Sequence, residues 1–147
     1  MIITFCGHDH VPDVHKDKEW LQHALDPYIH EETVICYLGG YGGFDRLAAS
    51  VVRQKQKGNP ALQAVLVIPY LNRKYDDSGY DYTLFPPLEA VSPRYAISKR
   101  NEWMAAQADV VIAYVTHDWG GAAKMLEYAR RKGKKVVLYP QTCCSCE

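Results

Sequence analysis

The sequence predicts an α/β fold: a Rossmann-like, doubly wound and mainly parallel sheet of five strands with helices on both faces. Short apolar runs alternate along the chain with stretches in which apolar side chains recur at helical spacing. Two of these runs are followed by glycine pairs shortly before a helical stretch begins. Strands and helices that alternate in this way form parallel sheets, and right-handed crossovers place helices on both faces.

Three expected strands and two expected helices alternate in the first half of the chain. The strands are apolar runs at residues 2–6, 34–38 and 64–68. The first helix, whose length Pro27 limits, carries an apolar stripe at Trp20, Leu21, Ala24, Leu25 and Tyr28. The second helix, which ends near Gly58-Asn59-Pro60, carries one at Phe44, Leu47, Ala48, Val51 and Val52.

Residues 70–95 interrupt this alternation, because they show no clean period and are rich in tyrosine, aspartate and proline. A long irregular segment in a compact domain is typically a functional lid or a mobile insertion. Its aromatic side chains close over a base by stacking or form a dimer surface, and the sequence leaves both open: Tyr70, Tyr75, Tyr80, Tyr82 and Phe85.

The alternation resumes with a third helix, for which Ser98 is the expected N-cap and Trp103 and Met104 the apolar face. The fourth strand, the fourth helix and the last strand are expected at residues 110–115, 122–132 and 136–139. Gly133 stands where a C-terminal glycine cap of the fourth helix belongs.

Length and composition predict one domain, at residues 1–140, followed by a short tail at 141–147. The 17 Lys and Arg side chains balance 17 Asp and Glu side chains, so no basic field for nucleic acid is present and no nucleic-acid partner is expected. No apolar run is long enough to span a bilayer, and the N-terminus reads directly as a strand. We therefore expect neither a membrane partner nor a signal peptide.

The cysteine pattern points to a reducing, cytoplasmic location, because the five cysteines form no disulfide framework. Cys6 and Cys36 lie in expected strands and are expected to be buried and inert. The tail is rich in cysteine, and incidental thiols explain it better than a metal site or a redox pair: Cys143, Cys144 and Cys146.

Two glycine-rich turns carry the strongest functional signal. Each follows an expected strand and opens an expected helix: Gly39-Gly40-Tyr41-Gly42-Gly43 and Asp118-Trp119-Gly120-Gly121. Free N–H groups and the positive end of the helix dipole at such turns stabilise an anion, most simply a phosphate. Glycines also make tight turns without any ligand, but two such turns in one short chain favour binding. Neither has the spacing of a dinucleotide fold or a P-loop, so no NAD, ATP or other cofactor is expected.

These motifs resemble those of the SLOG superfamily, the Rossmann-like group that contains the DprA/Smf proteins and the LOG phosphoribohydrolases, and among its members small YpsA-like proteins are most similar. The run from Gly39 to Ala49 resembles the DprA-type turn, in which glycines precede an aspartate and a helix of small residues. The run from Gly120 to Ala129 resembles the second phosphate turn. Phe5-Cys6-Gly7-His8 resembles the turn after the first strand, so the resemblance covers residues 1 to about 139.

The LOG branch implies which residues would carry N-glycosidic hydrolysis. The segment from Ser98 to Met104 is similar to the helix of that branch which holds a catalytic arginine, and the resemblance places Arg100 there. The family's catalytic glutamate falls on Ala123, and the nearest carboxylate is Glu127, about one helical turn further on. Asp45 or Glu89 substitutes only if the fold brings one of them over the ligand.

Several other polar residues are candidates for the site. Arg94, Lys99 and Arg100 cluster at the expected start of the third helix, where cations gain nothing from the dipole, so a phosphate clamp explains them better than a solvated surface. His8 and His10 lack the spacing of a metal site, and no metal is expected. Acid–base roles for His117 and Asp118 have weaker support than an ordinary polar loop.

The preferred hypothesis is a protein that binds or senses a nucleotide or a nucleotide-derived phosphorylated ligand. Its phosphate-cradling residues are the turn glycines: Gly39, Gly40, Gly42, Gly43, Gly120 and Gly121. Arg100 neutralises the phosphate, with Arg94 as a second candidate, while Gly7 and His8 line the ribose and Asp45 and Asp118 orient hydroxyls. The alternatives are a nucleoside 5′-monophosphate phosphoribohydrolase, which uses Arg100 and Glu127, and DprA-like binding of single-stranded DNA. A homo-oligomer is expected, because relatives of this kind commonly assemble.

Overall fold

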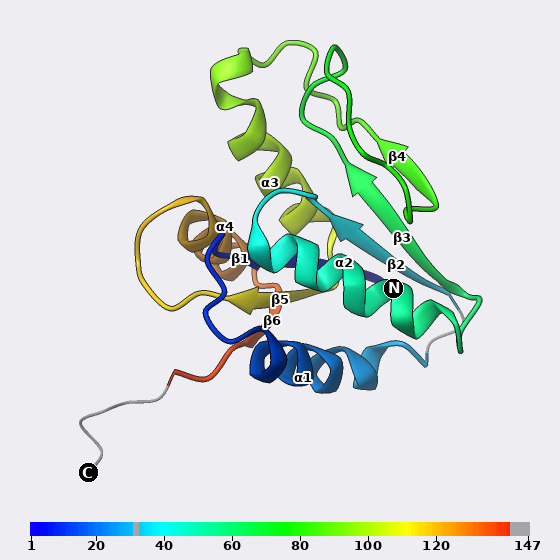
Figure 1. The fold of residues 1–147 in the computed structure, drawn as a ribbon. Coiled ribbons are helices and arrows are strands. Elements are labelled where there is room, and N and C mark those ends of the chain that lie inside the picture. The colour runs from blue at the N-terminus through cyan, green and yellow to red at the C-terminus, as the bar shows by residue number, and fades with distance from the viewer. Residues whose placement is uncertain (31–32, 142–147) are drawn as a thin grey trace.

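A computed structural model describes residues 1–30 and 33–141, and its architecture is a single parallel sheet with helices on both faces (Figure 1). Within this part of the chain the sheet has six strands in the order β4-β3-β2-β1-β5-β6, and every neighbouring pair is parallel. Their bounds are β1 Ile2–Gly7, β2 Val34–Leu38, β3 Leu62–Val67, β4 Tyr82–Leu84, β5 Val110–Tyr114 and β6 Lys135–Leu138.

Two helices pack on each face of the sheet. Helices α1 (Val14–Leu25) and α2 (Gly43–Gln56) cover one face, and α3 (Ala96–Gln107) and α4 (Gly121–Arg131) cover the other. Successive residues of β1 point to opposite faces, so Phe5 joins the core beneath α1 and α2 while Cys6 joins the core beneath α3 and α4. The Rossmann-like α/β class predicted from the sequence is confirmed.

The sheet differs from the prediction by one strand. Strand β4 lies within the segment that the sequence left without regular structure. It is only three residues long, so no period can be detected in it, and a polar contact anchors it to β3. The Asp81 carboxylate accepts the Ala64 N–H at 2.7 Å, and the Asp81 N–H donates to the Ala64 carbonyl at 2.8 Å.

The start of α3 also differs from the prediction. A 3₁₀ turn at Pro93–Tyr95 leads directly into the helix, so Tyr95 is the N-cap and Ser98 lies within the first turn. The expectation that Ser98 caps the helix is wrong, because the preceding turn already sets the direction of the chain. At the end of α4, Gly133 has a φ of +69°, as a C-terminal glycine cap requires.

The structure tests the expectations about two of the cysteines and about a membrane-spanning helix. Cys6 and Cys36 are free and buried, as predicted. Burial raises the pKa of each thiol to about 12, which keeps both protonated and unreactive at neutral pH. Cys143, Cys144 and Cys146 lie outside the described residues. Among the described helices, none is long and apolar enough to cross a membrane.

Candidate ligand-binding cleft

A cleft of about 440 Å³ opens at the carboxyl ends of the central strands β1 and β5, where the order of the sheet reverses. We call it the central cleft. In open α/β sheets this reversal is where ligands bind. The cleft brings together residues that the sequence analysis selected from separate segments: Gly7, His8, Gly42, Asp45, Arg100, Gly120 and Gly121.

The first glycine turn leads into a helix whose N-terminus is already closed. The Gly43 N–H donates to the carbonyl of Asp9 at 2.9 Å and to its carboxylate at 3.1 Å, and the Phe44 N–H donates to the His8 carbonyl at 3.2 Å. Gly7 permits this approach, because a Cβ at Gly7 would collide with the Phe44 ring. The first N–H groups of α2 are therefore used within the protein itself.

The second glycine turn leaves the N-terminus of α4 open. Gly120, the N-cap, has a φ of +92° and provides no side-chain cap. Within the described residues, the N–H groups of Gly121, Ala122 and Ala123 have no hydrogen-bond partner. Gly120, Gly121 and Ala122 line the central cleft, so these donors and the positive end of the helix dipole are available to an anion there.

Arg100 extends from α3 to the same cleft and is only 3% exposed. Its Nη1 donates to the carbonyls of Gly39 at 3.1 Å and Val67 at 2.8 Å, which ties α3 to the ends of β2 and β3. Its Nη2 has no hydrogen-bond partner among the residues that the structure describes. Burial lowers the pKa of Arg100 and the charge of Asp45 opposes that shift, so the guanidinium remains a cation.

Asp45 supplies a carboxylate to the cleft. Its Oδ2 accepts the N–H of Tyr41 at 3.2 Å. Burial raises the pKa of this carboxyl to about 6, although Arg100 and the Tyr41 N–H both act to lower it. Asp45 therefore changes charge just below neutral pH, within the electrostatic influence of the Arg100 cation.

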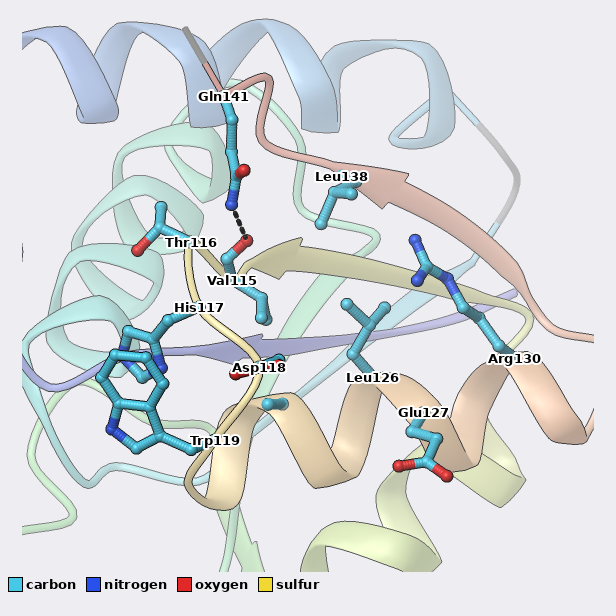
Figure 2. Close-up of a pocket in the computed structure, with 11 residues that line it drawn as sticks. Val115, Thr116, His117, Asp118, Trp119, Leu126, Glu127, Arg130, Leu138 and Gln141 are labelled. Carbon is cyan, nitrogen blue, oxygen red and sulfur yellow. Dashed lines mark hydrogen bonds between the residues drawn. The ribbon is translucent and has the colours of Figure 1, made fainter. Parts of the chain in front are cut away.

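A stack of three aromatic rings, which was not predicted from the sequence, forms one wall of the cleft. The His8 and His117 rings lie 3.6 Å apart between centroids, and His117 and Trp119 are also 3.6 Å apart (Figure 2 shows the latter pair). His8 Nε2 accepts the Thr116 N–H at 2.9 Å, which joins the end of β1 to the second glycine turn. Burial, and secondarily His117, lower the pKa of His8, so the ring stays neutral. The sequence signal for this wall was the presence of aromatic residues in and next to the second glycine turn, His117 and Trp119.

Other predicted site residues lie outside the central cleft. Asp118 and Glu127 line a separate pocket of about 550 Å³ between α4 and the end of β6, in which Arg130 stands one helical turn from Glu127 (Figure 2). Arg94 is exposed and lies over the Tyr95 ring at 5.4 Å. The structure therefore does not bring Arg100 and Glu127 into one pocket.

Of the remaining predicted site residues, some lie next to the central cleft and others lie away from it. Gly39 and Gly40 line a smaller space next to the central cleft, and Gly43 contacts Asp9. Lys99, from the basic cluster, pairs with Glu102 at 3.1 Å. Glu89, the other alternative carboxylate, is exposed. Asp45 is thus the predicted carboxylate that does line the cleft with Arg100.

Comparison with known proteins identifies the fold. No family model matches the chain, and no curated protein matches it. Among solved structures, the X-ray structure of DNA processing protein A (DprA) from Streptococcus pneumoniae is similar, with a TM-score of 0.71 and 19% sequence identity. The fold is DprA-like. The match covers 97% of this chain and 51% of the DprA chain, so this chain spans about half the length of that protein.

Proposed function

We propose that this protein binds a phosphorylated, nucleotide-derived small molecule in the central cleft. The observation that carries the proposal is that the uncapped N-terminus of α4 and the buried cation of Arg100 open on one cleft. The phosphate accepts hydrogen bonds from the N–H groups of Gly121 and Ala122, and Arg100 balances its charge. The DprA-like fold supports this position, because it places the cleft where such sheets bind ligands.

The remainder of the ligand lies against polar and aromatic groups of the same cleft. Gly7 and His8, at the end of β1, line the ribose side, and Asp45 accepts a hydrogen bond from a hydroxyl. Tyr41 and Trp119 are 75% and 66% exposed and line the cleft from the two different glycine turns. Large exposed rings at a polar cleft provide stacking surfaces for a base.

The proposal is tested with two variants of equal size at the N-terminus of α4. A Cβ at Gly121 meets no neighbouring atom, so Gly121→Asp and Gly121→Asn both fit. Calorimetric titration with nucleoside 5′-monophosphates measures affinity. We expect Gly121→Asp to weaken binding about tenfold or more through charge repulsion, with Gly121→Asn close to wild type. Equal affinities in the two variants, or no binding of any monophosphate by the wild type, would reject the proposal.

A nucleotide N-glycosidase is a second candidate, and the position of Asp45 favours it. Hydrolysis of the glycosidic bond needs a carboxylate that activates water or stabilises positive charge on the ribose. Asp45 lines the cleft with Arg100, and its pKa is raised to about 6. Incubation with nucleoside monophosphates and chromatography of free base tests this candidate. This candidate predicts release by the wild type and none by Asp45→Asn; no release by the wild type rejects it, and release that survives in the variant contradicts the role of Asp45.

Single-stranded DNA is a third candidate ligand, because the similar solved structure is named for DNA processing. The balanced charge of the chain argues against it, since a chain without an excess of cations attracts the phosphate backbone less strongly. Titration of a labelled single strand at low salt discriminates this candidate from the first. Tight binding that weakens steeply with added salt would favour DNA over a small nucleotide.

A further inference from the structure

A second, smaller space lies beside the central cleft, and the proposed ligand position does not use it. We call it the tyrosine pocket: a space of about 110 Å³ between the β2–α2 turn and the segment that follows β3. Tyr70, Arg73 and Tyr75 line it from that segment, and Arg100 lines both this pocket and the central cleft. Its volume accommodates a few water molecules or one small anionic group.

The charged side chains that line the tyrosine pocket are cations, and the Asp45 carboxylate lies near Arg100 on the side of the central cleft. Two of its lining residues are arginines, Arg73 and Arg100, and no carboxylate lines it. The Arg73 guanidinium is held over the Tyr70 ring, with its carbon 3.9 Å from the ring centroid. Tyr70 is fixed in turn, because its hydroxyl donates to the Pro93 carbonyl at 2.7 Å. Arg73 is exposed, yet a cation–π contact holds it at the pocket.

Tyr75, one of the lining residues, has a hydroxyl without a partner. The Tyr75 Oη is buried and has no hydrogen-bond partner among the described residues. A buried polar atom of this kind costs free energy unless something satisfies it, and buried hydroxyls in folded proteins are nearly always paired. A tyrosine with an unpaired hydroxyl and two arginines line the same pocket, and an oxyanion would satisfy this set of donors.

We propose that the tyrosine pocket is an oxyanion subsite, which receives a second acidic group of the ligand bound in the central cleft. Tyr75 donates a hydrogen bond to an oxygen of this group, and Arg73 and Arg100 balance its charge. The ligand class is therefore a nucleotide-derived molecule with two acidic groups, one on each side of Arg100. The existence of this anion subsite does not depend on the proposed function. Only the claim that a single ligand places one acidic group in each site rests on the proposed function.

Sulfate tests the subsite without knowledge of the ligand. Its titration, followed by NMR, reports separately on backbone amides near Arg73 and Tyr75 and on those at the start of α4. We expect both groups of signals to shift in the wild type. Arg73→Gln is expected to weaken the first response about tenfold, as loss of one charge-assisted hydrogen bond predicts, and to leave the second unchanged. Lys74→Gln, which removes the neighbouring exposed charge, is the matched control and is expected to change neither.

Tyr75→Phe separates a binding hydroxyl from one that is merely buried. If the hydroxyl donates to the anion, the variant weakens sulfate binding at the tyrosine pocket. The inference is wrong if the amides near Tyr75 do not respond to sulfate, or if Arg73→Gln and Lys74→Gln behave alike. A failure of the proposed function has a different signature, namely no response at Gly121 and Ala122.

Two nucleotides then test whether one ligand spans both sites. We compare a nucleoside 5′-monophosphate with the corresponding 5′-diphosphate by calorimetric titration. If one ligand spans both sites, Arg73→Gln weakens the diphosphate about tenfold and the monophosphate far less. Equal losses for the two nucleotides, together with an intact sulfate response in the wild type, assign the subsite to a free anion and reject the two-group ligand.

Discussion

Asp45 gives the central cleft a charge that changes with pH. Burial raises its pKa to about 6, so the carboxylate takes up a proton as the pH falls through that value and no longer opposes Arg100. We expect the affinity for sulfate, whose own charge is constant in this range, to increase as the pH falls from about 7.5 to about 5. Calorimetric titration across this range measures the effect.

The Asp45→Asn variant is the control for this prediction. It removes the titrating carboxyl and keeps an oxygen that accepts the Tyr41 N–H. The variant is expected to lose the larger part of the pH dependence, and any remainder belongs to other titratable groups of the cleft, among them His8. Identical pH profiles for the wild type and the variant would contradict the role given to Asp45.

Arg100 is expected to contribute to stability as well as to ligand binding. Its Nη1 satisfies two carbonyls at the ends of β2 and β3, and a lysine ammonium lacks the planar fork that reaches both. We expect Arg100→Lys to lower the free energy of unfolding by about 2 kcal/mol, measured by urea denaturation. Arg94→Lys changes an exposed arginine and is expected to have almost no effect. An equal, small effect of both substitutions would show that the two carbonyls find other donors.

At the level of elements, the packing of β1 against α2 depends on the absence of a side chain at Gly7. An added Cβ would overlap the Phe44 ring, which is fully buried. We expect Gly7→Ala to destabilise the protein by about 2 kcal/mol, as overpacking of a core does. A Cβ at Gly58 meets no neighbouring atom, so Gly58→Ala is the matched control and is expected to be neutral. Thermal unfolding of both variants provides the measurement, and a stable Gly7→Ala variant would indicate that Phe44 can move aside.

The elements with a clear apolar period were the ones that the sequence predicted well. Helices α2 and α4 present buried stripes, and the main strands are apolar runs. Strand β4 was missed because it is only three residues long and is defined by its pairing with β3, and the Asp81 contact beside it joins residues 17 positions apart, which leaves no local pattern. The start of α3 was misplaced for a similar reason, since a 3₁₀ turn sets it and no capping side chain marks it.

At the level of the whole molecule, stability is expected to depend on pH through His8. The folded protein holds the neutral ring, so the pKa of His8 is lower than in the unfolded chain, where it is about 6.5. Protonation therefore favours unfolding, and stability is expected to decline as the pH falls below about 6.5. Asp45 acts in the opposite direction, because its raised pKa favours the folded state as it is protonated.

The two effects are separated in the Asp45→Asn background. In Asp45→Asn, the urea midpoint is expected to be lower at about pH 5.5 than at about pH 7.5. When His8→Gln is added to this variant, the difference between the two midpoints is expected to become smaller. The glutamine amide oxygen can still accept the Thr116 N–H, so this contact is kept. The same pH response with and without His8 would assign the acid sensitivity to other groups.

The candidate site was only partly accessible to sequence reasoning. The glycine turns and Arg100 have local signatures, so they were found, and the sheet brings Arg100 and the second turn to one cleft. Closure of α2 by Asp9 joins residues 34 positions apart, and the bond from Thr116 to His8 joins residues 108 positions apart. Contacts of such separation depend on the assembled sheet, which is why the different roles of the two turns emerge only from the structure.

The short segment after β1 connects both sides of the cleft. His8 and Asp9 accept the first N–H groups of α2, while the His8 ring accepts the Thr116 N–H next to the second glycine turn. The two turns are thus braced against each other before any ligand arrives. A ligand entering between them orders few additional torsions, so most of its contact energy is retained as affinity and little is spent on conformational entropy.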